Sequence, residues 1–362
     1  MPDTLLPATK RGNCEQPMKQ LKSNERIRVL CVIPTKRTPA TKFSMIFAER
    51  QVAALLEAGL EVECFYLLVE PDLRTMVEQW RRLRETIWDF CPDVVHAQYG
   101  TVTALLSVLS SHVPAVITFR GSDLNPEPAA GRIVCLIRRL ISELAALRAN
   151  QIICVSPQLK ARLWWRRSRA IVIPTGVDTE QFRPRPRVEA RKQLGWKDDS
   201  ERIVLFNAGG NPRIKRLDLA QAALEVAREI CGDIRLVVIN GEVPPDRVPL
   251  YMAGADLLLL TSDWEGSPTI VQEANACELP VVSVDVGDVR ERLEGVLPSF
   301  IVPRDSVAIG RVIAEFLVHR RRSNGADRIS ECSNSVVIER TISAYRAAIH
   351  NNLNSPLLKE GL

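Results

Sequence analysis

Short apolar segments alternate with helical segments through most of the chain, and this alternation restricts the possible folds more than any other feature. In the first half, the pattern predicts strands at 26–33, 60–67, 93–97, 115–119, 151–155 and 170–173. It predicts helices at 46–58, 72–90, 105–111, 132–148 and 157–165. A strand, helix, strand order favours a parallel sheet with helices on both faces, which is the doubly wound α/β class.

The second half repeats this pattern after a connector. Pro174–Asp178 and the polar, Pro-rich 179–200 precede predicted strands at 202–206, 234–239, 255–260 and 280–284 and helices at 217–230, 270–277 and 307–320. We therefore expect two domains, 25–176 and 177–335, with a ligand in the cleft between them. The polar residues 1–24 are predicted to be a disordered lead-in.

The composition is that of an ordinary globular protein. The 362 residues are 46% hydrophobic and 25% charged. The nine cysteines are scattered and contain no C-x-x-C, so neither a disulfide framework nor a structural zinc site is indicated, and a reducing, cytoplasmic location is expected. We find no signal-peptide pattern and no apolar run of membrane-spanning length.

Two acidic residues stand out in the stretch 262–287. Glu265 and Glu273 are separated by seven residues and follow a predicted buried strand, with Gly266, Ser267 and Pro268 interrupting regular structure before the next helix. A helix N-terminus at the carboxyl end of a parallel sheet binds anions, because its free N–H groups and its dipole point at the ligand. The carboxylates suit the hydroxyl groups of a sugar or ribose attached to that anion.

Two basic residues lie in the loop that opens the second domain. Arg213 and Lys215 come just after one predicted strand and before a helix, where cations hold a diphosphate and stabilise a departing nucleotide. The alternative is a solvated basic loop without a ligand.

Four sequence segments resemble one enzyme family. A-D-L-L-L-L-T-S-D-W-E-G-S-P-T-I-V-Q-E-A-N-A-C-E-L-P-V-V resembles the donor-site signature of the retaining GT-B glycosyltransferases of family four, also called glycosyl transferase group 1. That signature is E, seven residues, then E-A-x-A-x-G-x-P-V-V. Similar to other family segments are V-I-P-T-G-V-D-T-E-Q-F-R-P, T-F-R-G-S-D and N-P-R-I-K-R-L-D-L-A. The resemblance covers about residues 26–350.

The resemblance implies a GT-B fold, in which two Rossmann-like doubly wound domains face a cleft and the last helix, about 336–350, packs back on the first domain. It implies transfer of a sugar, with retention, from a nucleotide-diphosphate sugar to a sugar or lipid-linked acceptor on the first domain. Polysaccharide or glycolipid synthesis is the expected setting. No metal ion and no cofactor beyond this co-substrate is expected.

In the second domain, the resemblance assigns Lys215 to the leaving diphosphate, Glu265 to the donor sugar and Glu273 to the ribose. The backbone of Gly266, Ser267, Pro268 and Thr269 would meet the phosphates. Arg213 is a shifted substitute for the arginine of the family pattern, and Glu278 stands in place of its usual glycine.

In the first domain, Arg120 replaces the histidine that the family places at the reacting centre, so the identity of the donor is open. An arginine is no base at neutral pH, but it binds phosphate or carboxylate. Asp123 would contact sugar hydroxyls on the acceptor side or cap a turn. His96 ends a strand near the cleft, where a structural role is the alternative.

Several other functions lack their sequence signals. There is no Asp-x-Asp pair for a metal-bound nucleotide sugar, no G-x-G-x-x-G after the first strand, no Walker-A loop and no nucleic-acid-binding module. Two alternatives stay open: a non-hydrolysing nucleotide-sugar epimerase, which needs acid and base groups at the sugar, and a non-catalytic GT-B scaffold.

The segment 131–169 is strongly basic. It has nine Lys or Arg and a single acid, Glu143, and it places Trp164-Trp165 beside Arg166-Arg167. Aromatic residues next to arginines are typical of surfaces that contact anionic lipid headgroups, which would place the protein peripherally at the inner face of the membrane. The alternative is a solvated basic face, with the apolar residues of the predicted helix packed on the sheet.

Overall fold

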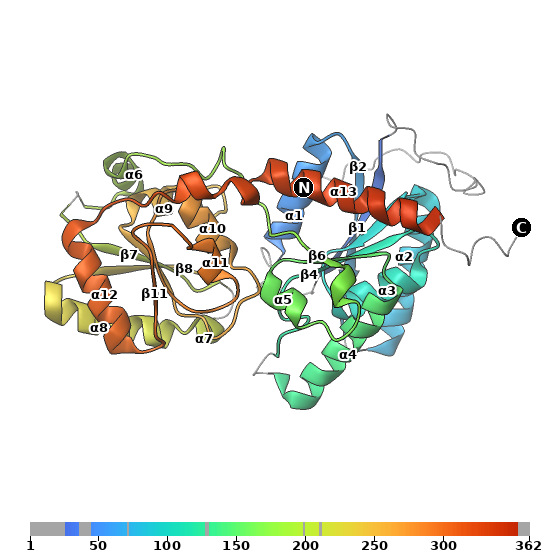
Figure 1. The fold of residues 1–362 in the computed structure, drawn as a ribbon, viewed down its shortest axis with the longest axis horizontal. Coiled ribbons are helices and arrows are strands. Elements are labelled where there is room, and N and C mark those ends of the chain that lie inside the picture. The colour runs from blue at the N-terminus through green and yellow to red at the C-terminus, as the bar shows by residue number, and fades with distance from the viewer. Residues whose placement is uncertain are drawn as a thin grey trace, which may run out of the picture.

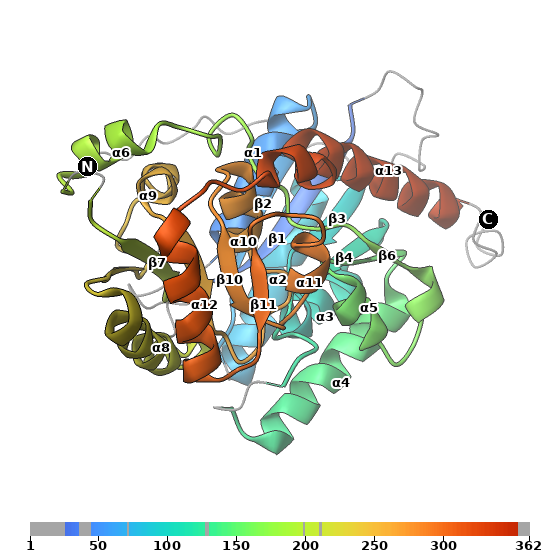
Figure 2. The ribbon, with the colours of Figure 1, turned by 60° about the vertical axis from the view of Figure 1, so that its left-hand side comes forward.

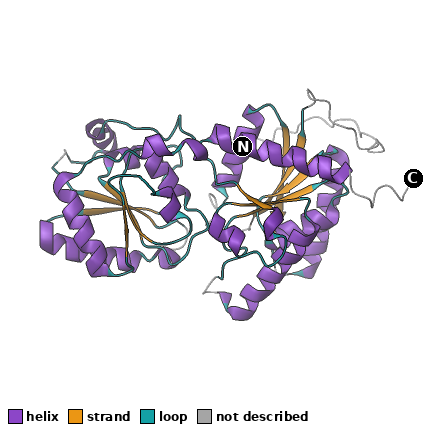
Figure 3. Ribbon diagram, viewed as in Figure 1, coloured by secondary structure: helices purple, strands orange, loops and turns teal. Residues whose placement is uncertain are grey.

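The computed structural model describes residues 26–35, 45–70, 72–126, 130–197, 200–209 and 212–353. The predicted lead-in, 1–24, lies outside these residues. Two parallel sheets, each covered by helices on both faces, make up the described part of the chain (Figure 3). This arrangement confirms the predicted α/β fold class.

The first sheet has six parallel strands in the order β2-β1-β3-β4-β5-β6. Its strands are β1 (Arg28–Thr35), β2 (Glu61–Leu68), β3 (Val94–Ala97), β4 (Ala115–Phe119), β5 (Gln151–Cys154) and β6 (Ala170–Val172). Its helices are α1 (Ile46–Glu57), α2 (Leu73–Phe90), α3 (Thr101–Ser110), α4 (Arg132–Arg148) and α5 (Pro157–Ala161). The strand order reverses between β1 and β3, and ligands of doubly wound sheets bind at such a switch point.

The second sheet has five parallel strands in the order β11-β10-β9-β7-β8, with its switch point between β9 and β7. Its strands are β7 (Ile203–Asn207), β8 (Arg235–Ile239), β9 (Leu257–Leu260), β10 (Val281–Val284) and β11 (Phe300–Val302). Its helices are α6 (Arg187–Leu194), α7 (Pro212–Lys215), α8 (Leu217–Cys231), α9 (Val248–Gly254), α10 (Thr269–Ala276), α11 (Val289–Arg292) and α12 (Ser306–His319).

The chain crosses between the sheets twice, and the two crossings pair with each other. Val177 donates its N–H to the carbonyl of Cys332 and accepts from the N–H of Asn334, at 2.8 and 2.9 Å. After the second crossing, α13 (Asn334–Leu353) runs along the first domain (Figures 1 and 2). Its Val337, Ile338 and Tyr345 join the core formed by β1 and its neighbours.

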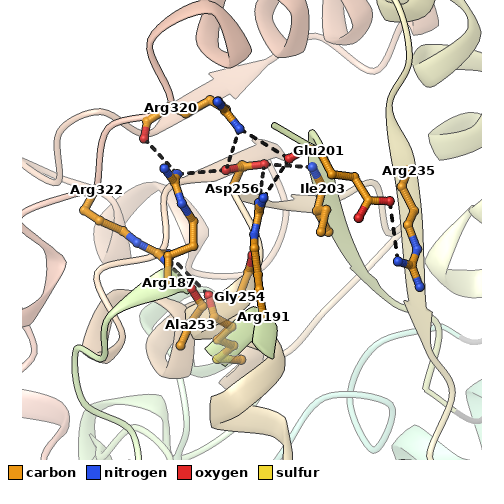
Figure 4. A network of polar contacts seen from close by, with 11 residues as sticks. Arg187, Arg191, Glu201, Ile203, Arg235, Ala253, Gly254, Asp256, Arg320 and Arg322 are labelled. Atoms are coloured by element: carbon orange, nitrogen blue, oxygen red, sulfur yellow. Dashed lines mark hydrogen bonds and ion pairs between the residues drawn. The ribbon is translucent and has the colours of Figure 1, made fainter. Parts of the chain in front are cut away.

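A buried ionic network fixes the connector to the second domain. Asp256, which precedes β9, accepts hydrogen bonds from Arg187 (2.9 Å) and Arg191 (3.0 Å) of α6 and from the N–H of Ile203 (2.7 Å) (Figure 4). The side chain of Asp256 is 0% exposed and that of Arg191 is 1% exposed. This network lies at the amino ends of β7 and β9, at the edge of the sheet opposite to the switch-point loops.

Several local predictions differ from the structure. The helix predicted at 157–165 ends at Ala161, with Arg162 as its C-cap, and the chain turns again at Arg166, which adopts a left-handed conformation (φ 57°). The apolar residues of α4 were expected to pack on the sheet, but most are exposed. The short elements α9, α11 and β11 were not predicted. Seven of the described cysteines are free thiols.

Candidate active site

A cavity of about 530 Å³ lies between the two domains, where both switch points face each other. It is lined by the end of β1 (Thr35), the residues after β3 (Tyr99), Asn207 at the end of β7, and Trp264 in the loop after β9. Seven predicted site residues also line it: Lys215, Glu265, Gly266, Ser267, Pro268, Thr269 and Arg120. The structure therefore brings residues from both domains to one cavity.

Glu265 and Lys215 form an ion pair on the second-domain wall. Lys215 Nζ lies 2.5 Å from Glu265 Oε1, which also accepts a hydrogen bond from Ser262 Oγ at 2.7 Å. Two other contacts hold the loops that carry them. Thr261 Oγ1 donates to the carbonyl of Lys215 (2.8 Å), and Arg304 donates to the carbonyls of Thr261 and Ser262. A diphosphate arriving here would meet a lysine that is already fixed in position.

The N-terminus of α10 forms the adjacent part of this wall. Its N-cap is Pro268, and no side chain caps the first turn, so Thr269 and Ile270 present helix-terminal backbone at the cavity. Ser267 Oγ instead donates to Asp288 Oδ2 at 2.9 Å, and burial raises the pKa of Asp288. An uncapped helix N-terminus beside a lysine suits a phosphate group.

Arg120 lies on the first-domain wall, surrounded by uncharged acceptors. Its guanidinium donates to the carbonyl and side-chain oxygens of Gln98, to Gln51 Oε1 at 2.8 Å and to Thr175 Oγ1 at 3.4 Å. It stacks 4.4 Å from the ring centre of Phe47. Burial lowers its pKa to about 10, so it stays cationic at neutral pH. It adds positive charge to the cavity but has no capacity to act as a base.

Asp123 and His96 lie beneath the cavity lining. Asp123 is buried, and its carboxylate accepts from the N–H groups of Gly100 (3.0 Å), Arg120 (2.9 Å) and Gly121 (2.8 Å). His96 is also buried, with Nδ1 2.6 Å from Tyr345 Oη and Nε2 2.7 Å from Thr118 Oγ1. In this structure both residues position neighbouring groups and do not reach the space a ligand would fill.

Replacing His96 by asparagine is expected to reduce the loss of stability in acid. Burial lowers the pKa of His96 from 6.5 to about 3. Between these values the unfolded chain binds a proton that the folded protein does not, so wild-type stability falls as pH drops, by up to about 1.4 kcal/mol per pH unit. We expect this slope to be smaller in H96N. Urea unfolding between roughly pH 6 and pH 4 measures it, and equal slopes would contradict the assignment.

Glu273 does not line the cavity but pairs with the opposite domain. Arg50 of α1 lies 2.6 Å from Glu273 Oε1, and the glutamate side chain is 8% exposed. Burial raises the pKa of Glu273, and Arg50 opposes this rise. A ribose would have to displace or share this arginine. Arg213 is exposed on α7 and also lies outside the cavity lining.

Sequence reasoning missed the residues that support the site from a distance along the chain. Arg50, Gln51 and Phe47 all lie on α1, and Arg304 follows β11. The sequence of α1 is that of an ordinary amphipathic helix and does not indicate that its residues reach the cavity. The polar turn Gln98-Tyr99 after β3 did indicate that polar groups gather at this edge of the first sheet.

The described residues contain neither a membrane-spanning helix nor a cluster of metal-ligating side chains. None of the described helices is both long and apolar enough to cross a bilayer. Across the same residues, no group of three or more His, Cys, Asp or Glu side chains is placed to hold a metal ion.

Comparisons with known proteins agree with this geometry. The family model described as Glycosyltransferase Family 4 matches residues 26–181, and the model described as Glycosyl transferases group 1 matches residues 188–319. TuaC of Bacillus subtilis, a glycosyltransferase provisionally assigned to teichuronic acid biosynthesis, is 26% identical over 80% of this chain and 80% of its own length. The D-inositol 3-phosphate glycosyltransferase 1 of Catenulispora acidiphila is 26% identical over 73% of this chain and 74% of that protein.

Solved structures share the fold. The sucrose-phosphate synthase of Thermosynechococcus elongatus superposes with a TM-score of 0.73 at 17% identity, covering 90% of this chain and 100% of that one. Anabaena HepE, solved with UDP-glucose, superposes with a TM-score of 0.68 at 16% identity, covering 88% and 100%. With two glycosyltransferase family models spanning both domains of this fold, the chain belongs to the GT-B glycosyltransferases.

Proposed function

We propose that this glycosyltransferase moves a sugar from a nucleotide-diphosphate sugar to an acceptor hydroxyl with retention at the anomeric carbon, in the synthesis of a polysaccharide, glycolipid or related glycoconjugate. The acceptor is a sugar or a lipid-linked sugar, and the reaction takes place in the cytoplasm, at the inner face of the membrane when the acceptor carries a lipid. The observation that carries the proposal is the cavity wall formed by Lys215, Glu265 and the N-terminus of α10.

Each part of this wall suits one part of the donor. Lys215 and the free end of α10 supply positive charge to the diphosphate, so the leaving group is stabilised without a metal ion. Glu265, held by Lys215 and Ser262, offers carboxylate oxygens to the hydroxyls of the sugar.

Transfer is expected to need no metal ion, so activity should persist unchanged in excess EDTA. Loss of activity in EDTA, with recovery when a divalent cation is added, would contradict this part of the proposal.

Retention is favoured because the described cavity lining offers no candidate general base on the acceptor side. An inverting transfer needs a general base that takes the proton from the acceptor hydroxyl. Among the described residues that line the cavity, Glu265 is the one carboxylate, it lies on the donor side and it is paired with Lys215, and no histidine lines the cavity. The epimerase alternative needs both an acid and a base at the sugar, and the described lining supplies one carboxylate, which is already paired with Lys215. The scaffold alternative gains no support from a cavity wall that holds Lys215 and Glu265 beside the N-terminus of α10.

The chemistry is tested by donor binding followed by product analysis. Among UDP-, GDP- and ADP-sugars, we expect at least one to raise the melting temperature by several degrees, since a ligand at about 100 times its Kd contributes about 2.7 kcal/mol. With that donor, NMR of the product should show the anomeric configuration of the donor. An inverted product would contradict retention, and no stabilisation by any donor would contradict the donor site.

The role of Glu273 is tested with two variants that break the same ion pair. Glu273→Ala removes the proposed ribose ligand together with the pair, whereas Arg50→Ala removes the pair and keeps the carboxylate. We expect the donor-induced thermal shift to be lost in E273A and retained in R50A. Equal loss in both variants would mean that the pair acts by holding the domains together and that Glu273 does not bind the ribose.

A further inference from the structure

The first half of α4 projects from the first domain (Figure 1). Its apolar side chains are exposed. The buried residues of this helix are confined to its second half, from Ser142 to Ala146. Exposed apolar residues follow one another along it: Ile133 (75% exposed), Val134, Leu136, Ile137, Leu140, Leu144 and Leu147. Single exposed apolar residues are normal, but a continuous stripe marks an interaction site.

A tryptophan pair lies beside this helix. Trp164 and Trp165 are 43% and 42% exposed, with their rings in edge-to-face contact at 6.2 Å. The turn that carries them is fixed to α4, because Glu143 accepts the N–H of Trp164 at 2.8 Å and Arg139 stacks 4.1 Å from the Trp164 ring. We call the exposed residues of α4, apolar and basic, and the segment 162–169 together the α4 surface.

The charge of the α4 surface is almost entirely positive. Glu143, the single acid of segment 131–169, is 0% exposed and is bound to the tryptophan turn, so it contributes no negative charge outside. Basic residues of the segment that remain exposed are Arg132, Arg138, Arg148, Arg162, Arg167 and Arg169. The α4 surface therefore combines three kinds of side chain that suit an anionic bilayer. Apolar side chains suit the acyl chains, tryptophans suit the interface, and arginines suit the lipid phosphates.

We propose that the α4 surface docks on an anionic lipid bilayer, with the apolar stripe and Trp164–Trp165 entering the interface and the arginines contacting lipid phosphates. A second copy of this chain is a poorer occupant, since a symmetric contact would bring the same arginines against each other. Nucleic acid is poorer too, because the exposed stripe would meet charged backbone.

Docking through the α4 surface would also bring the cavity close to the membrane. Arg138 of α4 lines the cavity that contains Lys215 and Glu265. A protein held at the bilayer by α4 would therefore have its cavity beside the membrane surface, where a lipid-linked acceptor is delivered. This step, unlike the docking itself, rests on the proposed transferase function.

Vesicle flotation of the full chain tests the docking. We expect flotation with phosphatidylcholine vesicles that contain phosphatidylglycerol, and none with phosphatidylcholine alone. Two double variants, I133Q/I137Q and R167E/R169E, should each lower the vesicle-binding constant at least about tenfold. Each charged contact contributes about 1 kcal/mol, each buried Ile side chain about 1.5–3 kcal/mol, and 1.4 kcal/mol is a factor of ten in the constant. Single-site controls of the same residue types on other helices are Leu73→Gln on α2, where Leu73 is 75% exposed like Ile133, and Arg311→Glu on α12.

Three outcomes would overturn the proposal. The first is absence of wild-type flotation with anionic vesicles, and the second is flotation of both double variants at the wild-type level. The third is a wild-type dimer that becomes monomeric in I133Q/I137Q without any vesicle binding, which would assign the surface to a second copy. The donor-induced thermal shift, measured on the same variants, should stay unchanged. Failure of flotation with an intact thermal shift would reject the docking and leave the proposed function standing.

Discussion

Replacing Lys215 by methionine is expected to lower kcat by roughly 10²–10³-fold, the usual effect of removing one group that stabilises charge in a transition state. Methionine keeps much of the side-chain length, so the loss concerns the charge. In the protein without donor, Lys215 is already held 2.5 Å from Glu265 and lies on the cavity wall. It therefore meets the leaving diphosphate without a large rearrangement. Steady-state kinetics with the stabilising donor measures the effect.

Arg213 provides the control, because it lies on the same short helix but is exposed and outside the cavity lining. Arg213→Met should change kcat far less than K215M does. If the two variants lose activity equally, the positive potential of the whole loop matters and the contact of Lys215 does not. If K215M keeps wild-type kcat, the assigned role of Lys215 is wrong.

Replacing Asp256 by alanine is expected to lower the free energy of unfolding by about 3–5 kcal/mol, because removal of one partner leaves buried charge uncompensated. Arg191 is 1% exposed and would lose its carboxylate partner, and Arg187 would lose its own. The N–H of Ile203 would lose its acceptor as well. Urea unfolding should show a lower midpoint with an unchanged slope.

The comparison for this variant is an aspartate–arginine pair on the surface. Asp285 and Arg290 lie 2.6 Å apart, and both side chains are more than half exposed. Asp285→Ala should cost about 0–1 kcal/mol, as surface pairs do. A D256A protein as stable as D285A would show that the buried network adds nothing to stability.

The fold could be predicted because its signals are local. Each strand of a parallel sheet is a short apolar run, and the run Leu257–Leu260, buried throughout, is recognisable without any partner. The exposure of α4 could not be predicted in this way. A helix with Ile133, Ile137, Leu140 and Leu144 has the spacing of a packed helix, and only the position of its neighbours shows that nothing described covers it.

The second-domain wall of the candidate site could be predicted, because one continuous stretch of sequence supplies most of it. Glu265 and residues 266–269 follow one strand, so their common position follows from chain order. The first-domain wall depends on contacts between distant segments. Gln51, Gln98 and Thr175 converge on Arg120, and no spacing in the sequence relates them. Arg50 reaches Glu273 across 223 positions of the chain, which is also invisible to pattern analysis.

At one point the two domains approach each other through a pair of glycines. Gly121 follows Arg120 on one side, and Gly266 follows Glu265 on the other. A Cβ atom on Gly266 would lie 2.0 Å from the carbonyl oxygen of Arg120, and one on Gly121 would lie 3.3 Å from the Cα of Gly266. Any side chain at position 266 would therefore act as a spacer that keeps the domains apart. The approach of residue 266 to the carbonyl of Arg120 therefore depends on a hydrogen atom standing where every other residue has a Cβ atom.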